Sequence, residues 1–265
     1  MFRMSSVSRS ALFGITVLTI GLGLVPAVVL VSTVGVSGFV RAWHSSYQLS
    51  SALETTLLSG IIALAIIVLL GGPTVWYLAR QAPPRLVTWA LGLILVPLFM
   101  PPLVLGLVLA YVLGPDTAVG TILSAWGVSP TNSWFSLVVA QVYEALPYFL
   151  ITAWAGLSTL STRVEESALS LNRRPREVFW YVTVPLAAPS LIAATAMAWS
   201  RVVGAFGAVV ILAYHPTGLP VAIWIGLQEL GLAQALPLAL WLLIVGLPIP
   251  LGFAWRGERH VALRR

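Results

Sequence analysis

Long apolar runs repeat along the whole chain and restrict its fold more than any other feature of the sequence. Each of six such runs is long enough to cross about 30 Å of hydrocarbon as a helix. Hydrophobic residues make up 59% of the 265 residues, against roughly 45–50% in soluble domains. We therefore predict an all-α, polytopic membrane bundle with six transmembrane helices, at Ala11–Val34, Leu53–Ala79, Leu86–Gly114, Ser133–Ser158, Ala187–Tyr214 and Ala233–Ala254.

The runs indicate one membrane domain over residues 1–265, without a separate catalytic domain. The first run is longer than the 7–15 apolar residues of a signal peptide, so we expect it to stay as a helix. The chain has no cysteine, which excludes disulfides and thiolate ligands, and its three histidines are far apart in the predicted topology, so no metal site is expected. The net charge of +6 comes from arginines at the ends of apolar runs, which indicates a lipid bilayer rather than nucleic acid as the partner.

The arginines also predict the orientation of the chain. Arg41 lies on one side and Arg201 within the fifth run, whereas the other twelve fall on the opposite side. The positive-inside rule therefore predicts that both termini are cytoplasmic. The loops on the other side are expected to be short and weakly charged, and to carry Trp43, Tyr47, Asp116, His215, Gln228 and Glu229. The twelve arginines on the predicted cytoplasmic side are Arg3, Arg9, Arg80, Arg85, Arg163, Arg173, Arg174, Arg176, Arg256, Arg259, Arg264 and Arg265.

Three prolines interrupt the third run, namely Pro97, Pro101 and Pro102. Proline removes a backbone donor, and the carbonyls it frees need partners from protein or water inside a membrane. We therefore expect the backbone of this span to be buried in the bundle.

A charged segment stands between the fourth and fifth runs, where Arg163 to Glu177 hold seven charged residues in a chain that is 8% charged. Ser161 or Thr162 is expected to cap a short helix with Glu165 and Glu166 in its first turn. Asn172 tolerates the left-handed conformation that ends many helices, and Pro175 prevents simple continuation. Two short helices meeting at Asn172 are predicted, either as a loop that binds anionic headgroups or as a docking element for a cytoplasmic partner.

The spacing in this segment resembles the cytoplasmic loop of ABC importer permeases, which reads E-A-A, three residues, G, nine residues, I-x-L-P. Here Glu166-Ser167-Ala168 precedes Asn172 by the same three residues, and Val182-Thr183-Val184-Pro185 follows after nine. Serine, asparagine and valine replace the usual alanine, glycine, isoleucine and leucine. The resemblance implies the type I importer permease fold, with a core at about 51–250 and a coupling loop at about 159–186.

The same resemblance implies the partners of the chain. They are a second copy of the chain, two ATP-binding cassette subunits and an extracytoplasmic substrate-binding protein. The chain has no GxxxxGK[ST] phosphate loop, so we expect no enzyme activity and no cofactor in it, with ATP and Mg held by the partner ATPase. The residues expected to couple to the ATPase are Glu165, Glu166, Ser167, Ala168, Leu169, Ser170, Leu171, Asn172 and Pro185.

Three further stretches resemble permeases for molybdate or tungstate, with sulfate permeases close behind: Pro97–Gly114, Ala140–Leu150 and Ser200–Trp224. One departure is Ala205, where those relatives have an acidic residue before F-G-A. Sulfate, thiamine, iron and polyamine import therefore remain as alternatives. The candidate pore and gate residues are Pro101, Pro102, Glu144, Arg201, Gly204, Ala205, Phe206 and Gly207.

Arg201 has two interpretations, because a charge within a span is unfavourable unless it faces the bundle interior. It can act as a pore residue within reach of a dianion, or as a structural cation paired with Glu144 or with helix carbonyls. Glu144 and Gln141 could also form a proton relay in a secondary transporter, although that function leaves the loop spacing unexplained. A membrane scaffold without transport activity is a third possibility, and it predicts no substrate-dependent ATPase. We expect the pathway between two copies, lined by Pro97–Gly106 and Ser200–Gly207.

Overall fold

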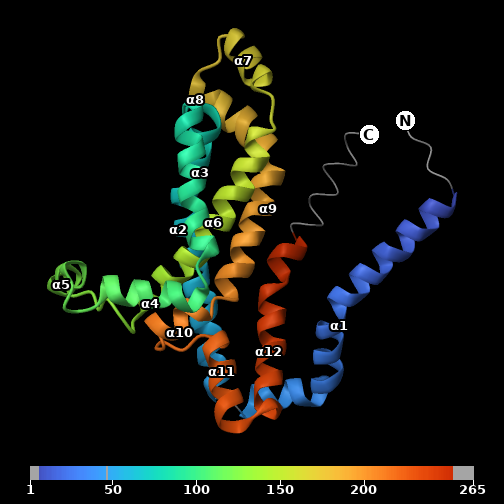
Figure 1. Ribbon diagram of the computed structural model, residues 1–265, viewed down its shortest axis with the longest axis vertical. Coiled ribbons are helices and arrows are strands. Elements are labelled where there is room, and N and C mark those ends of the chain that lie inside the picture. The colour runs from blue at the N-terminus through green and yellow to red at the C-terminus, as the bar shows by residue number, and fades with distance from the viewer. Residues whose placement is uncertain (1–5, 46, 253–265) are drawn as a thin grey trace.

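The computed structural model describes residues 6–45 and 47–252, and every regular element within those ranges is a helix (Figure 1). This confirms the all-α prediction. The elements are α1 (Ser6–Ser45), α2 (Tyr47–Arg80), α3 (Pro84–Phe99), α4 (Pro102–Leu113), α5 (Ala118–Ala125), α6 (Trp134–Ser158), α7 (Thr162–Ser170), α8 (Pro175–Val178), the π-helical turn η1 (Phe179–Thr183), α9 (Val184–Val203), α10 (Gly207–Leu212), α11 (Leu219–Leu230) and α12 (Leu232–Gly246).

Five of the described helical segments are long and apolar enough to cross a membrane, and they follow the predicted runs in order. A sixth span requires α3 and α4 to be taken together, because the chain bends by 104° between them. The predicted count of six therefore holds only if this bent pair is one span. The five straight segments are Leu12–Val40, Leu49–Arg80, Trp134–Ser158, Pro175–Val203 and Leu232–Gly252.

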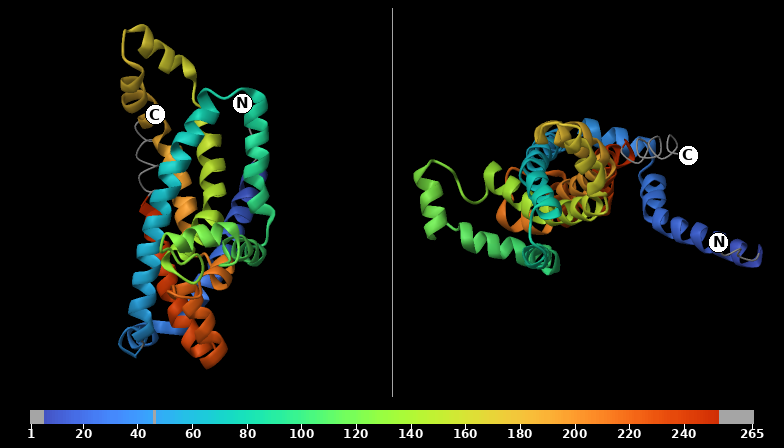
Figure 2. Two further views of the ribbon diagram at one scale, coloured as in Figure 1. Left: turned by 90° about the vertical axis from the view of Figure 1, so that its left-hand side faces the viewer. Right: turned by 90° about the horizontal axis from the view of Figure 1, so that it is seen from above.

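The centre of the bundle consists of α2, α6 and α9, which lie side by side along the longest axis (Figures 1 and 2). Small residues at the contacts allow this close packing, since Gly71 of α2 meets Phe149 of α6, and Gly156 of α6 meets Ser190 of α9. The loop with α7 lies at one end of the bundle, which we call the α7 end. The opposite end is formed by α11 and the junction of α1 with α2 (Figure 1).

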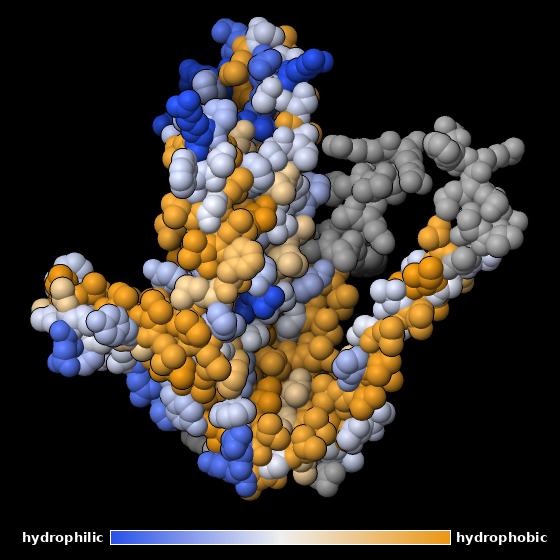
Figure 3. Space-filling view, viewed as in Figure 1, coloured by the Kyte–Doolittle hydropathy of each residue, from blue (hydrophilic) through white to orange (hydrophobic). Residues whose placement is uncertain are grey.

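Helix α1 is broken at Gly35 into two segments. The φ of Gly35 is 59°, with ψ of 176°, a conformation that is readily adopted only by glycine. The segment after Gly35 packs on α12, where the ring of Phe39 stacks on Trp241 at 4.2 Å between centroids. The segment before Gly35 stands apart as an apolar arm (Figure 3). None of the 18 residues in its most apolar stretch is buried, so this arm has an apolar surface that the chain itself leaves uncovered.

The third span differs from its prediction. The helix stops at Phe99 because Pro101 and Pro102 end the backbone ladder, and α4 then runs almost perpendicular to α3. Helix α3 contains no buried residue, and both prolines are exposed. The expectation that this backbone is buried in the bundle is therefore wrong for α3 in the chain on its own, whereas it holds for α4, which has four buried residues.

The fifth span is also shifted from its predicted bounds, since it begins at Pro175 and ends at Val203. Phe206 has non-helical backbone angles, so α10 is a separate short helix rather than the end of the span. Helix α11 was not predicted, and it contains Gln228 and Glu229, which were expected in a loop. The following predicted features lie outside the described residues: Arg3, Arg256, Arg259, Arg264, Arg265, His260 and the last two residues of the sixth span.

Candidate pathway and coupling sites

The bent third span meets a short helix where α4 crosses α10. A Cβ atom on Gly106 of α4 would lie 2.8 Å from the Cα atom of Ala208, and one on Gly207 would collide with Pro102. The two helices therefore touch through their backbones, which only glycine permits. The contact brings the Pro97–Gly106 stretch against the Ser200–Gly207 stretch, the two stretches expected to line the pathway. Leu105 and Leu109 of α4 fill the space beside these contacts.

Glu144 of α6 supports the same crossing. Its Oε1 atom accepts a hydrogen bond of 2.9 Å from the backbone N–H of Ala208, in the first turn of α10. The first amides of a helix have no partner within the helix, so a carboxylate there fixes where α10 begins. Glu144 thus joins α6 to α10 instead of forming the predicted ion pair with Arg201.

Arg201 lies on the exposed side of α9, so the expectation that it faces the bundle interior is wrong for the isolated chain. Its guanidinium carbon stands 4.2 Å from the centre of the Tyr148 ring, a cation–π contact with α6. The contact holds the cation on the bundle surface one turn from Gly204. Arg201 can therefore meet an anion or a second protein surface without rearrangement of the core.

The other predicted gate residues separate into exposed and buried positions. Gly204 is exposed, and apart from the carbonyl of Ser200 in the preceding turn its missing side chain faces open space. Ala205 is only 3% exposed and packs in a core cluster with α4 and α10, so its side chain does not face the open side. Phe206 is half-buried, and its ring lies 5.6 Å from that of Trp224 on α11.

Gln141 is buried at the centre of the bundle, where its Nε2 atom donates to Ser59 Oγ at 3.1 Å and to the carbonyl of Val202 at 3.4 Å. It therefore joins α2, α6 and α9 just before α9 ends. Gln141 and Glu144 bind different elements, which gives each a structural role and weakens the proton-relay interpretation.

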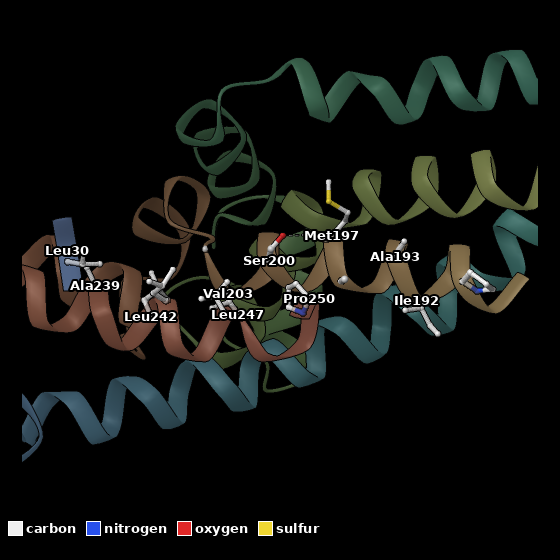
Figure 4. Close-up of a pocket in the computed structure, with 15 residues that line it drawn as sticks. Leu30, Ile192, Ala193, Met197, Ser200, Val203, Ala239, Leu242, Leu247 and Pro250 are labelled. Carbon is white, nitrogen blue, oxygen red and sulfur yellow. Dashed lines mark hydrogen bonds between the residues drawn. The ribbon is translucent and has the colours of Figure 1, made fainter. Parts of the chain in front are cut away.

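An apolar groove of about 830 Å³ runs between α9 and α12 (Figure 4). Met197 and Ser200 lie on its α9 wall, and Ala239 and Leu242 on its α12 wall. Ser200 carries the only side-chain oxygen among the lining residues, and none of them is charged. A surface of this kind suits an acyl chain or an apolar helix rather than an oxyanion.

The coupling loop forms largely as predicted. Ser161 caps α7 by accepting a hydrogen bond from the N–H of Arg163 at 3.3 Å. Asn172 has the expected left-handed conformation, with φ of 63°. Helix α8 begins at Pro175, but it continues through η1 into α9, so the second short helix is the start of the fifth span.

Glu165 and Glu166, both expected to couple to an ATPase, have different surroundings. Glu166 is exposed, whereas Glu165 turns toward the bundle and pairs with Arg80 at 3.1 Å. Sequence reasoning treated Arg80 only as an orientation signal and missed this pair. Pro185 is exposed at the start of α9.

The other side chains of α7, and Leu171 directly after it, make no side-chain hydrogen bond to the bundle. The hydroxyls of Ser167 and Ser170 donate to carbonyls of α7 itself, and Ala168 is half-buried. Leu169 and Leu171 are exposed, Leu171 at 77%. Exposed leucines in a charged loop are typical of a contact surface for another protein.

A comparison with known protein families identifies the family of this chain. Residues 71–255 match the family described as "Binding-protein-dependent transport system inner membrane component". The chain belongs to that family. It is a multi-pass membrane permease subunit of a transport system that depends on a binding protein, and not an enzyme.

Relatives of this permease extend over most of its length. A probable molybdenum ABC transporter permease protein of Haloferax volcanii is 32% identical, covering 75% of this chain and 71% of the relative. The molybdenum transport system permease protein ModB of Mycobacterium tuberculosis is 33% identical, over 78% and 79%. A sulfate transport system permease protein of Synechococcus elongatus is 28% identical, over 78% and 73%.

The fold of the permease also resembles a solved structure, a bacterial alginate ABC transporter in complex with a periplasmic protein bound to an alginate pentasaccharide. The TM-score is 0.68, with 96% of each chain covered and 16% sequence identity. At this identity the likeness establishes the fold alone. Within the part of the permease that the structure describes, no group of three or more His, Cys, Asp or Glu residues could hold a metal ion.

Proposed function

We propose that this permease imports molybdate or tungstate, driven by ATP hydrolysis in a separate subunit. The observation that carries the substrate is the identity of 32–33% to two molybdenum permeases over at least three quarters of the chain. The sulfate relative is less similar, at 28%, which makes sulfate the second candidate. The sequence of Ser200–Gly207 supports the same class, apart from Ala205.

The ATPase subunits, which hold ATP and Mg, dock at the α7 end, which faces the cytoplasm. The position of six arginines at this end supports that orientation, and strongly hydrophilic side chains gather there in the space-filling view (Figure 3). The exposure of Glu166 on α7 and of Leu171 directly after it supports the docking. The six arginines are Arg80, Arg85, Arg163, Arg173, Arg174 and Arg176.

Two copies of the permease surround one pathway. Two uncovered apolar surfaces support this arrangement: the arm of α1 before Gly35 and the groove between α9 and α12. A two-fold axis would supply the same surfaces twice. The mass of the detergent-solubilised complex is expected to correspond to two permease subunits, and a complex with a single copy would contradict the dimer.

Transport follows from differential affinity. ATP binding favours one of two arrangements of the bundle, because the ATPase subunits bind that arrangement more tightly. Movement of α7 reaches α9, whose far end lies beside the α4–α10 crossing. Arg201 and Gly204 lie on the open side of that end, so the pathway opens or closes there.

The substrate is tested with the permease, its ATPase and its binding protein in proteoliposomes. We expect ATP-dependent uptake of molybdate and tungstate, with sulfate taken up at a much lower rate at equal concentration. Equal or faster sulfate uptake would assign the chain to sulfate import. Uptake that continues without the ATPase would indicate a secondary transporter.

The docking surface is tested at Ala168. Its replacement by glutamate puts a large charge on α7, and we expect the ATPase to dissociate or hydrolysis to become uncoupled from uptake. Ala168→Ser serves as the control of similar size and is expected to behave like the wild type. Normal copurification and transport by Ala168→Glu would remove the docking assignment.

A further inference from the structure

Arg80, the last residue of α2, has four acceptors on two other parts of the chain. Its Nε atom donates to both carboxylate oxygens of Glu165 on α7, at 3.1 Å each. Its Nη1 atom donates to the carbonyl of Leu157 at 3.2 Å, and Nη2 to that of Leu160 at 3.4 Å. The guanidinium therefore also places a cation at the carbonyl end of α6 and just beyond it, where the helix dipole favours positive charge.

Thr183 adds a third element to this contact. Its hydroxyl, in the π-helical turn η1, donates to Oε1 of Glu165 at 3.0 Å. The Glu165 carboxylate is therefore held from α2 and from the start of the α9 span at once. The side chains of Arg80 and Glu165 are 7% and 17% exposed, and Thr183 is buried. Largely desolvated charge-assisted bonds of this kind are stronger than surface ion pairs.

Helix α7 has few other fixed connections to the bundle. It contains no buried residue, and it packs mainly on α8 and η1. The segments that flank it are turns, one of them at the left-handed Asn172. A force applied to α7 would be absorbed in these turns unless another contact carried it to the spans.

We propose that Arg80, Glu165 and Thr183 form the joint that transmits movement of α7 to spans α2, α6 and α9, and that Glu165 is not a docking contact for the ATPase. This inference rests on the proposed function, in which α7 receives the ATPase. The joint ends on η1, a π-helical turn, and such turns are frequent at functional sites. Displacement of Glu165 therefore acts on the start of α9, whose far end carries Arg201 and Gly204.

The test uses the complete complex with ATPase and binding protein, and compares Glu165→Gln with Glu166→Gln. Two quantities are measured: ATPase copurified per permease, and ATP hydrolysed per molybdate imported. For Glu165→Gln we expect unchanged copurification and a rise in ATP per molybdate of at least about fivefold, the lower end of typical couplings. For Glu166→Gln we expect reduced copurification, because its side chain faces outward.

Thr183 gives a second, milder pair of variants should the Glu165→Gln permease itself fail to fold in the membrane. Thr183→Val removes the hydroxyl at nearly constant shape and is expected to raise ATP per molybdate, whereas Thr183→Ser keeps the bond and the wild-type ratio. A purely structural role would lower the melting temperature while hydrolysis and transport fall together.

Three outcomes would overturn the joint: loss of ATPase binding in Glu165→Gln, an unchanged ratio in Glu165→Gln, or an unchanged ratio in Thr183→Val. Failure of the proposed function is distinguishable from these, because then the wild-type complex itself would not import molybdate.

Discussion

At the crossing of α4 and α10 two helices touch through glycine backbones, whereas at the α7 end a helix is held by charged side chains. Gly106 and Gly207 leave no room for even a methyl group. Glu165, in contrast, reaches its partners through flexible side chains, with part of its surface still exposed. The crossing is therefore sensitive to volume and the α7 end to charge. On the proposed function, such a difference suits a rigid element at the pathway and a movable one at the ATPase.

The largest effect is expected from added volume at the crossing. Gly106→Leu would force a side chain into the backbone of Ala208, and we expect a destabilisation of about 3 kcal/mol or more. Gly92→Leu is the matched control, since nothing lies within 4 Å of the position its Cβ would take. The measurement is the yield and melting temperature of the purified complex. Equal values for the two variants would contradict the close packing of α4 on α10.

Removal of the Glu144 carboxylate, which accepts a hydrogen bond beside the crossing, is expected to lower the free energy of unfolding by a smaller amount. Glu144→Leu leaves the N–H of Ala208 without its partner, which corresponds to about 1–3 kcal/mol for a buried donor. Glu144→Gln retains a side-chain oxygen and is expected to melt close to the wild type. Equal melting temperatures of Glu144→Leu and Glu144→Gln would show that the hydrogen bond from Glu144 to α10 does not stabilise the permease.

Arg201→Ala should have a small effect on stability and a larger one on transport. The cation–π contact with Tyr148 corresponds to about 0.5–1 kcal/mol at an exposed site. We therefore expect an intact complex with reduced molybdate uptake in proteoliposomes. A loss of yield and melting temperature in proportion to uptake would support the structural interpretation of Arg201, and wild-type behaviour in both assays would remove any special role.

The smallest effect is expected from the exposed ion pair at the α7 end. Arg173 and Glu177 are 3.9 Å apart with side chains 69% and 40% exposed, so Arg173→Ala should change stability by no more than about 0.5 kcal/mol. Its thermal denaturation is compared with that of the wild type at low and high salt. A large loss of thermal stability in Arg173→Ala would show that an exposed ion pair stabilises the fold. The exposed pair would then not differ in this respect from the largely buried pair of Arg80 and Glu165.

The sequence predicted the features that depend on local composition. Apolar runs identified the spans because each must hide its backbone from lipid, and Asn172 marked the end of α7 because few other residues adopt positive φ. The bend of 104° was not predictable in direction, because prolines specify where a helix ends but not where the chain goes next.

Contacts between distant residues were out of reach for the same reason. Arg80 and Glu165 are 85 positions apart, and nothing in a single sequence couples them. The burial of Ala205 depends on how the segment after α9 packs on α4 and α10, and the exposure of Arg201 depends on which face of α9 meets α6. Apolar periodicity does not reveal that face, since most residues of α9 are apolar on all sides.

Arg80 has one role during membrane insertion and another in the folded permease. During insertion, before α7 has been made, its charge helps to keep the segment between α2 and α3 in the cytoplasm on the proposed orientation. After folding, the same guanidinium is withdrawn from water and bound by Glu165 and by the end of α6. A neutral residue at this position would therefore disturb biogenesis and coupling together. Selection at position 80 thus acts on the newly made chain as well as on the working transporter.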